Sequence, residues 1–431
     1  MKLWKKSFTT EKKIDQFTVG NDRELDLILV EYDVLASKAH AKMLAKTELI
    51  SKEEETALLK ELDAIGKSVQ KGNFLIEEDF EDMHSKIEFL LTEKLGNIGK
   101  KIHTSRSRND QVLVAMQLFL KHELSEIKSQ TKNLFDLLLE LANKHQKVML
   151  PGYTHLQIAM PSSFGLWFSA YAESLIDDLY MLQAAFKTVN QNPLGSAAGY
   201  GSSFPIDREF TTKEMGFETL KFNVIAAQMG RGKVEKATAY GIASIASTLA
   251  KLAMDITLYM SQNFDFISFP DELTTGSSIM PHKKNPDVFE LIRAKCNSIQ
   301  AVPNQLLLVT NNLPSGYHRD LQVVKEIIVP ALQHMKACLE MMTFSLKEVR
   351  VNECILDDAK YDYLFSVDTL NEMVKNGMPF RDAYKAMAKA IENGNYKPKK
   401  DIQHTHEGSL GNLCLEEIRK KMDVLFRTSE T

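Results

Sequence analysis

The chain has few cysteines, and none of them is spaced to bind a metal or to form a redox pair. Cys296, Cys338, Cys354 and Cys414 are scattered, with no C-x-x-C pair among them. We expect reduced, buried thiols, as is usual in a cytosolic protein. Zinc-ligand patterns, H-E-x-x-H, the P-loop and G-x-G-x-x-G are also missing from the sequence, which therefore offers no motif for a metal or nucleotide cofactor.

Long apolar runs and an excess of positive charge are missing as well. The net charge is −4, so affinity for polyanions such as nucleic acid is not expected. The first residues, MKLWKKSFTTEKK, lack the apolar core of a signal peptide, and no run looks long and apolar enough to cross a bilayer. These absences predict a cytoplasmic protein without a membrane or nucleic-acid partner.

Proline is absent from two long stretches, and this favours long helices. None occurs before Pro151 or between Pro205 and Pro270. Proline inside a helix costs about 3 kcal/mol, so both stretches leave room for long helices. Within residues 112–145, apolar side chains recur at alternating spacings of three and four, which is typical of a bundle helix. This stripe consists of Met116, Leu120, Leu124, Ile127, Thr131, Leu134, Leu138 and Leu141.

The rest of the chain also predicts an all-α protein. Residues 233–262 repeat the apolar pattern, and residues 286–311 and 321–347 look helical, while strand alternation is scarce. Residues 191–205 are rich in glycine and serine and predict a long loop, which is either a linker or functional. We expect three parts: an N-terminal helical domain (1–105), a central long-helix bundle (106–350) and a small domain of short helices with an HTHEGSLGN turn (351–431).

Residues 271–290, DELTTGSSIMPHKKNPDVFE, combine groups that suit an anionic substrate. Ser277 supplies a hydroxyl, Lys283 a positive charge and Asn285 an amide, just before a helix that Pro286 can start. A plain loop could hold the same residues. However, hydroxyl, ammonium and amide groups beside a helix N-terminus also bind carboxylates.

The same segment closely resembles G-S-S-x-M-P-x-K-x-N-P, the signature of the fumarase/aspartase superfamily. Members of that family eliminate fumarate from succinyl-type substrates. The chemistry of the residues and the resemblance both indicate a carboxylate-binding site. Every fixed position of the signature is present, as Gly276, Ser277, Ser278, Met280, Pro281, Lys283, Asn285 and Pro286.

Two further segments are similar to the argininosuccinate lyase branch of this family. HTSRSRNDQ resembles H-T-G-R-S-R-N-D-Q, with Ser105 in place of the glycine, and on its own it would be a solvated helix start. Arg108 and Asn109 carry groups that bind carboxylates. PGYTHLQ matches a second region of the branch. A lone histidine is more often structural, but His155 suits proton delivery to a leaving nitrogen.

A last segment, YHRDLQVVK, resembles the branch element Y-N-K-D-L-Q-x-x-K, which holds the amino-acid end of the substrate. By itself it could be a capped, solvated helix start. His318 and Arg319 replace the usual Asn and Lys, whereas Tyr317, Gln322 and Lys325 match the pattern. In all, the resemblance runs from about residue 33 to residue 383.

The resemblance implies a catalytic role for several residues. Ser277 would be the general base for the β-carbon proton, which requires that the site stabilise its oxyanion. Lys283 and Asn285 would stabilise the doubly charged intermediate. His155, aided by Thr154, would help to protonate the leaving guanidinium nitrogen.

The resemblance also implies the remaining contacts and the assembly. Glu290 would pair with His155 and raise its pKa. The expected enzyme is a homotetramer whose active sites each draw on three chains, with no cofactor and no metal. Arg108 and Asn109 would bind substrate carboxylates, and the arginine portion would bind to Tyr317, Gln322 and Lys325.

Three departures from the branch pattern leave alternatives open. Asp22 stands where the branch has a substrate-contacting serine, Gly232 replaces an aspartate, and His282 replaces a glutamine, as in adenylosuccinate lyases. The chain therefore belongs to a diverged subfamily, to another fumarate-releasing lyase such as adenylosuccinate lyase, or to a non-catalytic protein on this scaffold. The HTSRSRND and YHRDLQVVK segments argue against the second reading, and retention of Ser277 and His155 argues against the third.

Overall fold

The structure is a computed structural model that describes residues 11–401 and 404–427. The polar N-terminal segment, predicted to lack a signal peptide, therefore lies largely outside the described residues. The chain divides into two compact units. Unit 1 comprises residues 1–128, 181–244 and 298–335, and unit 2 comprises residues 129–180, 245–297 and 336–431.

Unit 1 contains the N-terminal helices, whose starts follow from local sequence. Ser51 and Glu54 form a reciprocal capping box at the start of α3, and the Asp82 side chain accepts the backbone N–H of Ser85 at the start of α4. The apolar faces of α2, α3 and α4 are fully buried, as at Leu29, Leu58 and Leu91. Elements lying wholly in unit 1 are α1 (Lys12–Val19), α2 (Asp22–Lys46), α3 (Lys52–Gln70), α4 (Met83–Leu95), α5 (Asn97–Lys100), β3 (Gln191–Asn192), α8 (Arg208–Glu214), β4 (Thr219–Leu220), α9 (Val224–Gln228) and the 3₁₀ turns η1 (Lys101–His103) and η3 (Arg319–Gln322).

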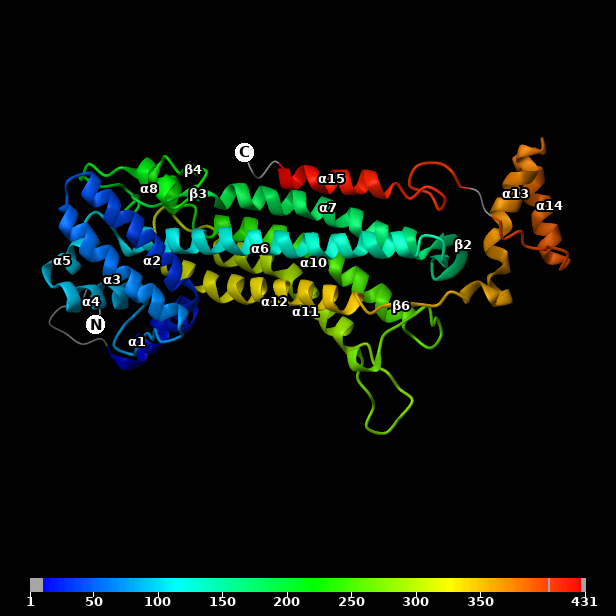
Figure 1. The fold of residues 1–431 in the computed structure, drawn as a ribbon, viewed down its shortest axis with the longest axis horizontal. Helices are drawn as coiled ribbons and strands as arrows, with labels where there is room; N and C mark the ends of the chain where they lie inside the picture. The colour runs from blue at the N-terminus through cyan, green and yellow to red at the C-terminus, as the bar shows by residue number, and fades with distance from the viewer. Residues whose placement is uncertain (1–10, 402–403, 428–431) are drawn as a thin grey trace. The chain divides into compact units, whose positions relative to one another are not determined.

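Five long helices each contribute residues to both units, and they confirm the predicted long-helix pattern (Figure 1). Every residue of the stripe predicted within 112–145 is at most 5% exposed. Pro303 and Pro330 lie inside two of these helices. The long helices are α6 (Arg108–Lys144), α7 (Phe164–Val189), α10 (Lys233–Tyr259), α11 (Asp287–Val309) and α12 (Val323–Leu346).

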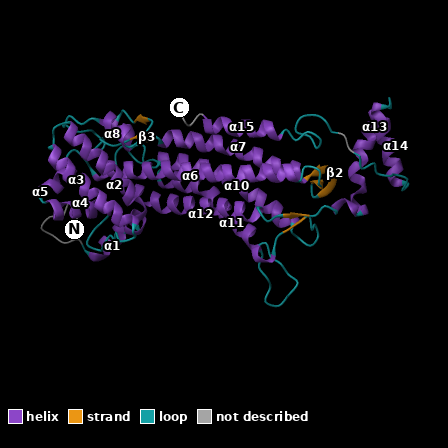
Figure 2. Cartoon of the chain, viewed as in Figure 1, coloured by secondary structure: helices purple, strands orange, loops and turns teal. Residues whose placement is uncertain are grey.

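Unit 2 adds short strands and the C-terminal helices. Strands are few and short among the described residues (Figure 2). The main pair is antiparallel, β1 with β2, and the predicted tail of short helices is confirmed. These elements are β1 (Met149–Thr154), β2 (Gln157–Ser163), β5 (Ile267–Ser268), β6 (Arg350–Val351), α13 (Ser366–Lys375), α14 (Phe380–Glu392), α15 (Leu415–Arg427) and the 3₁₀ turns η2 (Asp271–Leu273), η4 (Ile355–Asp357) and η5 (Ala359–Phe365).

The fold is mostly helical, as predicted, and two smaller expectations need correction. Cys296 and Cys338 are buried, but Cys354 is exposed and Cys414 is partly exposed, because both lie in connecting segments. One helix, α10, is long and apolar enough to cross a membrane, contrary to the prediction. Half of its most apolar window is buried inside the protein, as in a core helix. The three-domain division stays a prediction.

Candidate functional site

A charged cavity in unit 1, here called the first cavity, contains most of the residues predicted to bind substrate. They are Arg108, Asn109, Tyr317, Gln322 and Lys325. Its volume is about 250 Å³, and carboxylates and cations are equally numerous in its lining. Sequence reasoning missed the carboxylates Asp26, Glu81 and Asp82, which belong to none of the quoted motifs. The lining residues are Asp22, Asp26, Glu81, Asp82, Arg108, Asn109, Val112, Arg231, Tyr317, Arg319, Gln322 and Lys325.

Lys325 is held at the base of the first cavity by two carboxylates. Its side chain is 5% exposed, and Nζ lies 2.6 Å from Asp26 Oδ1 and 2.8 Å from Asp22 Oδ1. Burial lowers the pKa of Lys325, but Asp26 and Asp22 outweigh this and raise the pKa overall. Burial raises the pKa of Asp22, against the opposing effect of Lys325. Asp22, which replaces the serine of the branch pattern, therefore gives Lys325 a second carboxylate partner beside Asp26.

Arg108 is also held by carboxylates within the same unit. Its guanidinium lies 2.7 Å from Asp82 Oδ2 and 3.1 Å from Glu81 Oε2, and it donates to Ser85 Oγ at 2.9 Å. Glu81 Oε1 lies 3.1 Å from Arg319 Nη2, so this one carboxylate joins two motif arginines. A solvated helix start does not describe these contacts, because both carboxylates are buried and Arg108, which pairs with them, is partly buried. Arg108 would need to share its donors with any substrate carboxylate.

The turn before Arg108 has the strained backbone expected from its sequence. Ser105 has φ 61°, in the left-handed region where the branch pattern has glycine. The Ser105 hydroxyl is buried and has no hydrogen-bond partner among the described residues. The next residue of the motif, Arg106, is buried and donates to Ser37 Oγ at 2.9 Å, which is a structural contact.

Ser105→Gly should therefore stabilise the protein by about 1 kcal/mol, since it relieves the left-handed strain and removes a buried hydroxyl. Urea unfolding of both proteins at one protomer concentration measures this difference. The control is Ser107→Gly, which replaces the serine that accepts the backbone N–H of Asn109 and should destabilise. A loss of stability in Ser105→Gly would mean that its hydroxyl has a partner.

Asp110 anchors the predicted glycine- and serine-rich loop. Its carboxylate accepts the backbone N–H groups of Ser107 at 2.9 Å, Gly195 at 3.1 Å and Ala197 at 2.9 Å. Burial raises the pKa of Asp110 to about 6, although these three donors favour the charged form. Apart from the short strand β3 at its start, the segment is a loop as predicted. Its fixed attachment to the HTSRSRND motif argues against a free linker.

Arg231 lines the first cavity, and Gly232 follows it in the chain. The Arg231 guanidinium lies over the Tyr317 ring, 5.0 Å from its centroid. Gly232 has φ 81°, and a Cβ added there would lie 2.7 Å from Thr310 Cγ2. The aspartate of the branch pattern would thus meet both backbone strain and a clash with Thr310.

In unit 2, Thr154 and His155 lie at the tip of the β1–β2 hairpin. Strand pairing brings Thr154 opposite Gln157, and His155 and Leu156 form the turn with φ of 54° and 58°. Two residues with positive φ suit the twist of a tight hairpin. His155 is exposed and forms no hydrogen bond or ion pair with other described residues, so it is available to a ligand or a partner chain.

The GSS motif lies in an exposed loop of unit 2 that stands away from the long helices (Figure 1). Thr275 and Asn285 close its neck with two backbone hydrogen bonds of 2.8 and 3.3 Å, and Asn285 Nδ2 donates to Gly276 O at 3.2 Å. Ser277 Oγ accepts the backbone N–H groups of Met280 at 3.2 Å and Ile279 at 3.4 Å. These donors favour negative charge on the serine oxygen. We refer to residues 275–285 as the GSS loop.

The predicted pair between His155 and Glu290 is not made within the described chain. Glu290 lies in the first turn of α11, is exposed, and its Oε1 lies 3.9 Å from Arg293 Nη2. Lys283 is exposed and has no ion-pair partner among the described residues. The residues expected in catalysis thus lie in unit 2 together with Asn285, while the other residues expected to bind substrate line the first cavity of unit 1.

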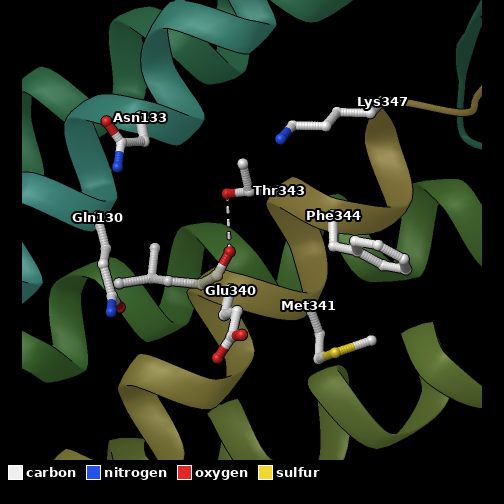
Figure 3. Close-up of a pocket in the computed structure, with 8 residues that line it drawn as sticks. Gln130, Asn133, Glu340, Met341, Thr343, Phe344 and Lys347 are labelled. Atoms are coloured by element: carbon white, nitrogen blue, oxygen red, sulfur yellow. Dashed lines mark hydrogen bonds between the residues drawn. The ribbon is translucent and has the colours of Figure 1, made fainter.

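A larger cavity of about 560 Å³ in unit 2 contains none of the motif residues. It lies between α6 and α12, and Thr343 Oγ1 donates to Leu339 O at 2.8 Å on its wall (Figure 3). Its lining includes the exposed apolar side chains of Met341 and Phe344. Size alone does not identify the functional site, because the chemistry expected from the motifs lies elsewhere.

Comparison with known proteins places this geometry in a family. Residues 2–301 match the Lyase family model, and the chain belongs to that family of enzymes. Within it, the chain is 57% identical to argininosuccinate lyase of Parabacteroides distasonis over 98% of this chain and 94% of the relative, and 38% identical to that of Thermotoga neapolitana over 90% and 97%. It is a member of the argininosuccinate lyase branch, carbon–nitrogen lyases of arginine biosynthesis.

Solved structures agree on the fold. An EDDS lyase structure superposes with a TM-score of 0.79 at 21% identity, over 97% of this chain and 90% of that chain. A fumarate lyase/delta-crystallin protein of Brucella melitensis gives a TM-score of 0.73 at 17% identity, over 94% and 91%. These likenesses confirm the predicted, mostly helical fold.

Proposed function

We propose that this enzyme eliminates fumarate from argininosuccinate and releases arginine, with the residues that the motifs indicate. The observation that carries the proposal is the complete GSS loop, exposed and with donors already aimed at Ser277 Oγ. The identity of the curated relatives supports the choice of substrate.

The reaction needs a base, an electrostatic stabiliser and an acid. Ser277 removes the β-carbon proton, and Lys283 and Asn285 stabilise the dianionic intermediate that this step creates. His155, with Thr154 beside it, helps to protonate the departing nitrogen, and Glu290 of a neighbouring chain orients it.

The first cavity would hold the arginine portion. Tyr317, Gln322 and Lys325 lie in its wall, and Arg108 and Asn109 meet the substrate carboxylates. Gln322 Nε2 already donates to Thr18 O at 2.9 Å and Val19 O at 3.2 Å, so its amide oxygen is the atom left for substrate. Carboxylates and cations together suit a zwitterionic amino acid.

We also propose a homotetramer in which several chains build each active site. A helix of 37 residues such as α6 is about 55 Å long, too long for one small substrate to bridge its two ends. Arg108 begins this helix, and the hairpin that carries His155 follows it. A second chain would supply the missing groups.

Exposed apolar side chains on the long helices support the same proposal. Large apolar residues scattered singly on a surface are normal, but those on the long helices would be buried if these helices packed against a second chain. The exposed side chains include Tyr180 51%, Met181 50%, Tyr240 50%, Met254 46%, Leu291 59%, Leu308 66% and Phe344 52%.

We further propose that the tetramer is cytoplasmic and needs neither nucleic acid nor a membrane.

One assay tests the proposed substrate. Purified protein is incubated separately with argininosuccinate, adenylosuccinate and aspartate, and fumarate is followed by its ultraviolet absorbance. We expect fumarate only from argininosuccinate. Release from adenylosuccinate alone would favour the adenylosuccinate reading suggested by His282, and no release from any substrate would favour a non-catalytic role.

Lys283→Met should lower kcat more than it raises KM. The Lys283 charge faces the developing dianion, so it stabilises the transition state more than the bound substrate. Steady-state kinetics with argininosuccinate measures both constants. Lys284→Met is the matched control, because Lys284 pairs with Asp271 at the base of the loop. A change in KM alone would make Lys283 a simple substrate anchor.

Asp22→Ser should retain activity, with kcat/KM for argininosuccinate within roughly tenfold of the parent, because Lys325 keeps its ion pair with Asp26. The control is Asp26→Ser, which also removes the acceptor of the Met83 backbone N–H and should destabilise the fold by roughly 2 kcal/mol. Kinetics and urea unfolding of both variants test this contrast. Argininosuccinate activity that appears only in Asp22→Ser would show that the parent evolved toward another substrate.

A further inference from the structure

Unit 1 contains another cavity, here called the basic cavity, that is lined by positive charge and by no aspartate or glutamate. Its volume is about 350 Å³, within the range of small-ligand sites. Arg231, Lys233 and Lys236 contribute to its lining from the start of α10 and the residues just before it. The turn at Pro314–Ser315–Gly316 closes the other side. Nothing in the motif-based function uses Lys233 or Lys236.

The positive charge of the basic cavity is only partly offset by the protein. Burial raises the pKa of Glu235, and the charges of Arg231 and Lys236 oppose this rise, so Glu235 acts on these cations without forming an ion pair with them. Within residues 11–401 and 404–427, neither lysine forms an ion pair, and Arg231 contacts the Tyr317 ring instead of a carboxylate. Burial lowers the pKa of the neighbouring Lys221, and repulsion from the charge of Lys233 lowers it further. This concentration of cations stands against a net charge of −4 for the whole chain.

The nearest buried carboxylate is committed elsewhere. Glu235 accepts the backbone N–H of Gly232 at 2.6 Å and so caps the start of α10, and its side chain does not line the basic cavity. The Thr310 hydroxyl donates to Leu306 O at 2.7 Å. The groups left for a ligand are therefore the three cations and the exposed hydroxyl of Ser315, a set that matches an oxyanion.

We propose that the basic cavity binds a small oxyanion with two or more negative charges, a chemistry that phosphate and short dicarboxylates share. Arg231 lines both this cavity and the first cavity. An anion bound here competes for the guanidinium that stacks on Tyr317, and so changes the affinity of the first cavity for its ligand. Anion binding itself requires no turnover, so it is independent of the proposed lyase activity.

Calorimetric titration of the full-length protein tests the site. Inorganic phosphate and succinate are titrated separately at constant ionic strength into the parent and into Lys233→Ala/Lys236→Ala. We expect the double variant to lose affinity roughly tenfold or more, because each lysine supplies a charge-assisted contact. The anion whose affinity falls when both lysines are replaced, phosphate or succinate, identifies the source of the ligand. Succinate that binds in the first cavity would show no such dependence.

Two controls complete the experiment. Lys251→Ala removes an exposed lysine from the same helix, away from the basic cavity, and should leave affinity unchanged. Lys233→Arg/Lys236→Arg keeps the charge and should retain binding, and circular dichroism confirms that all variants fold. Absence of binding to the parent by both anions, or equal affinities in the parent and the alanine double variant, would overturn the proposal.

Discussion

Ser277→Ala should abolish turnover while leaving helix content and assembly intact. The hydroxyl is the proposed base, and loss of a positioned general base typically lowers rate by about 10²–10⁴. The backbone N–H groups of Ile279 and Met280 donate to Ser277 Oγ, so the alanine variant loses the oxygen that these two groups stabilise. Fumarate release under saturating argininosuccinate measures the loss.

The neighbouring hydroxyl provides the matched control. Ser278→Ala changes the next residue of the same exposed loop, so it tests loop chemistry without the proposed base. We expect this variant to keep most of the activity. Near-normal turnover by Ser277→Ala, with turnover lost in Ser278→Ala, would move the role of base to Ser278.

Two inactive variants should regain activity when they are denatured together and refolded. If His155 and Ser277 reach one site from different chains, some mixed tetramers contain a site in which both positions are wild type. Random assembly of His155→Asn and Ser277→Ala chains in equal amounts gives roughly one such site in four. We expect fumarate production by the mixture at about that fraction of the parent rate.

The comparison that decides this outcome is each variant refolded alone, which should stay inactive. A site built from one chain could not recover, because every chain in the mixture carries a lesion. Native mass spectrometry establishes whether mixed tetramers form. Mixed tetramers without recovered activity would mean that the sites are not shared between chains.

The long helices were predictable because burial is periodic along them. Met116 to Leu141 alternate at spacings of three and four, and the structure buries every one of the predicted stripe residues. The β1–β2 hairpin was missed as a sheet because its residues Pro151, Gly152 and Tyr153 show no clear alternation.

The site was predictable in its residues but not in its electrostatic surroundings. Motif matching identified Arg108 and Lys325, yet their partners Glu81 and Asp26 lie in segments without a quoted motif. Such partners are set by tertiary packing across tens to hundreds of positions, which local spacing does not encode. An acidic residue at the unusual position 22 was the one available signal of this pairing.

The left-handed Gly232 has a consequence for how the family could diverge. Its missing Cβ would fall 2.7 Å from Thr310 Cγ2, and a residue with a side chain would also pay for φ 81°. A return to the family aspartate therefore requires a change at Thr310 and in the local backbone at the same time. The difference at position 232 can persist as a historical contingency of packing, without any selection for another substrate.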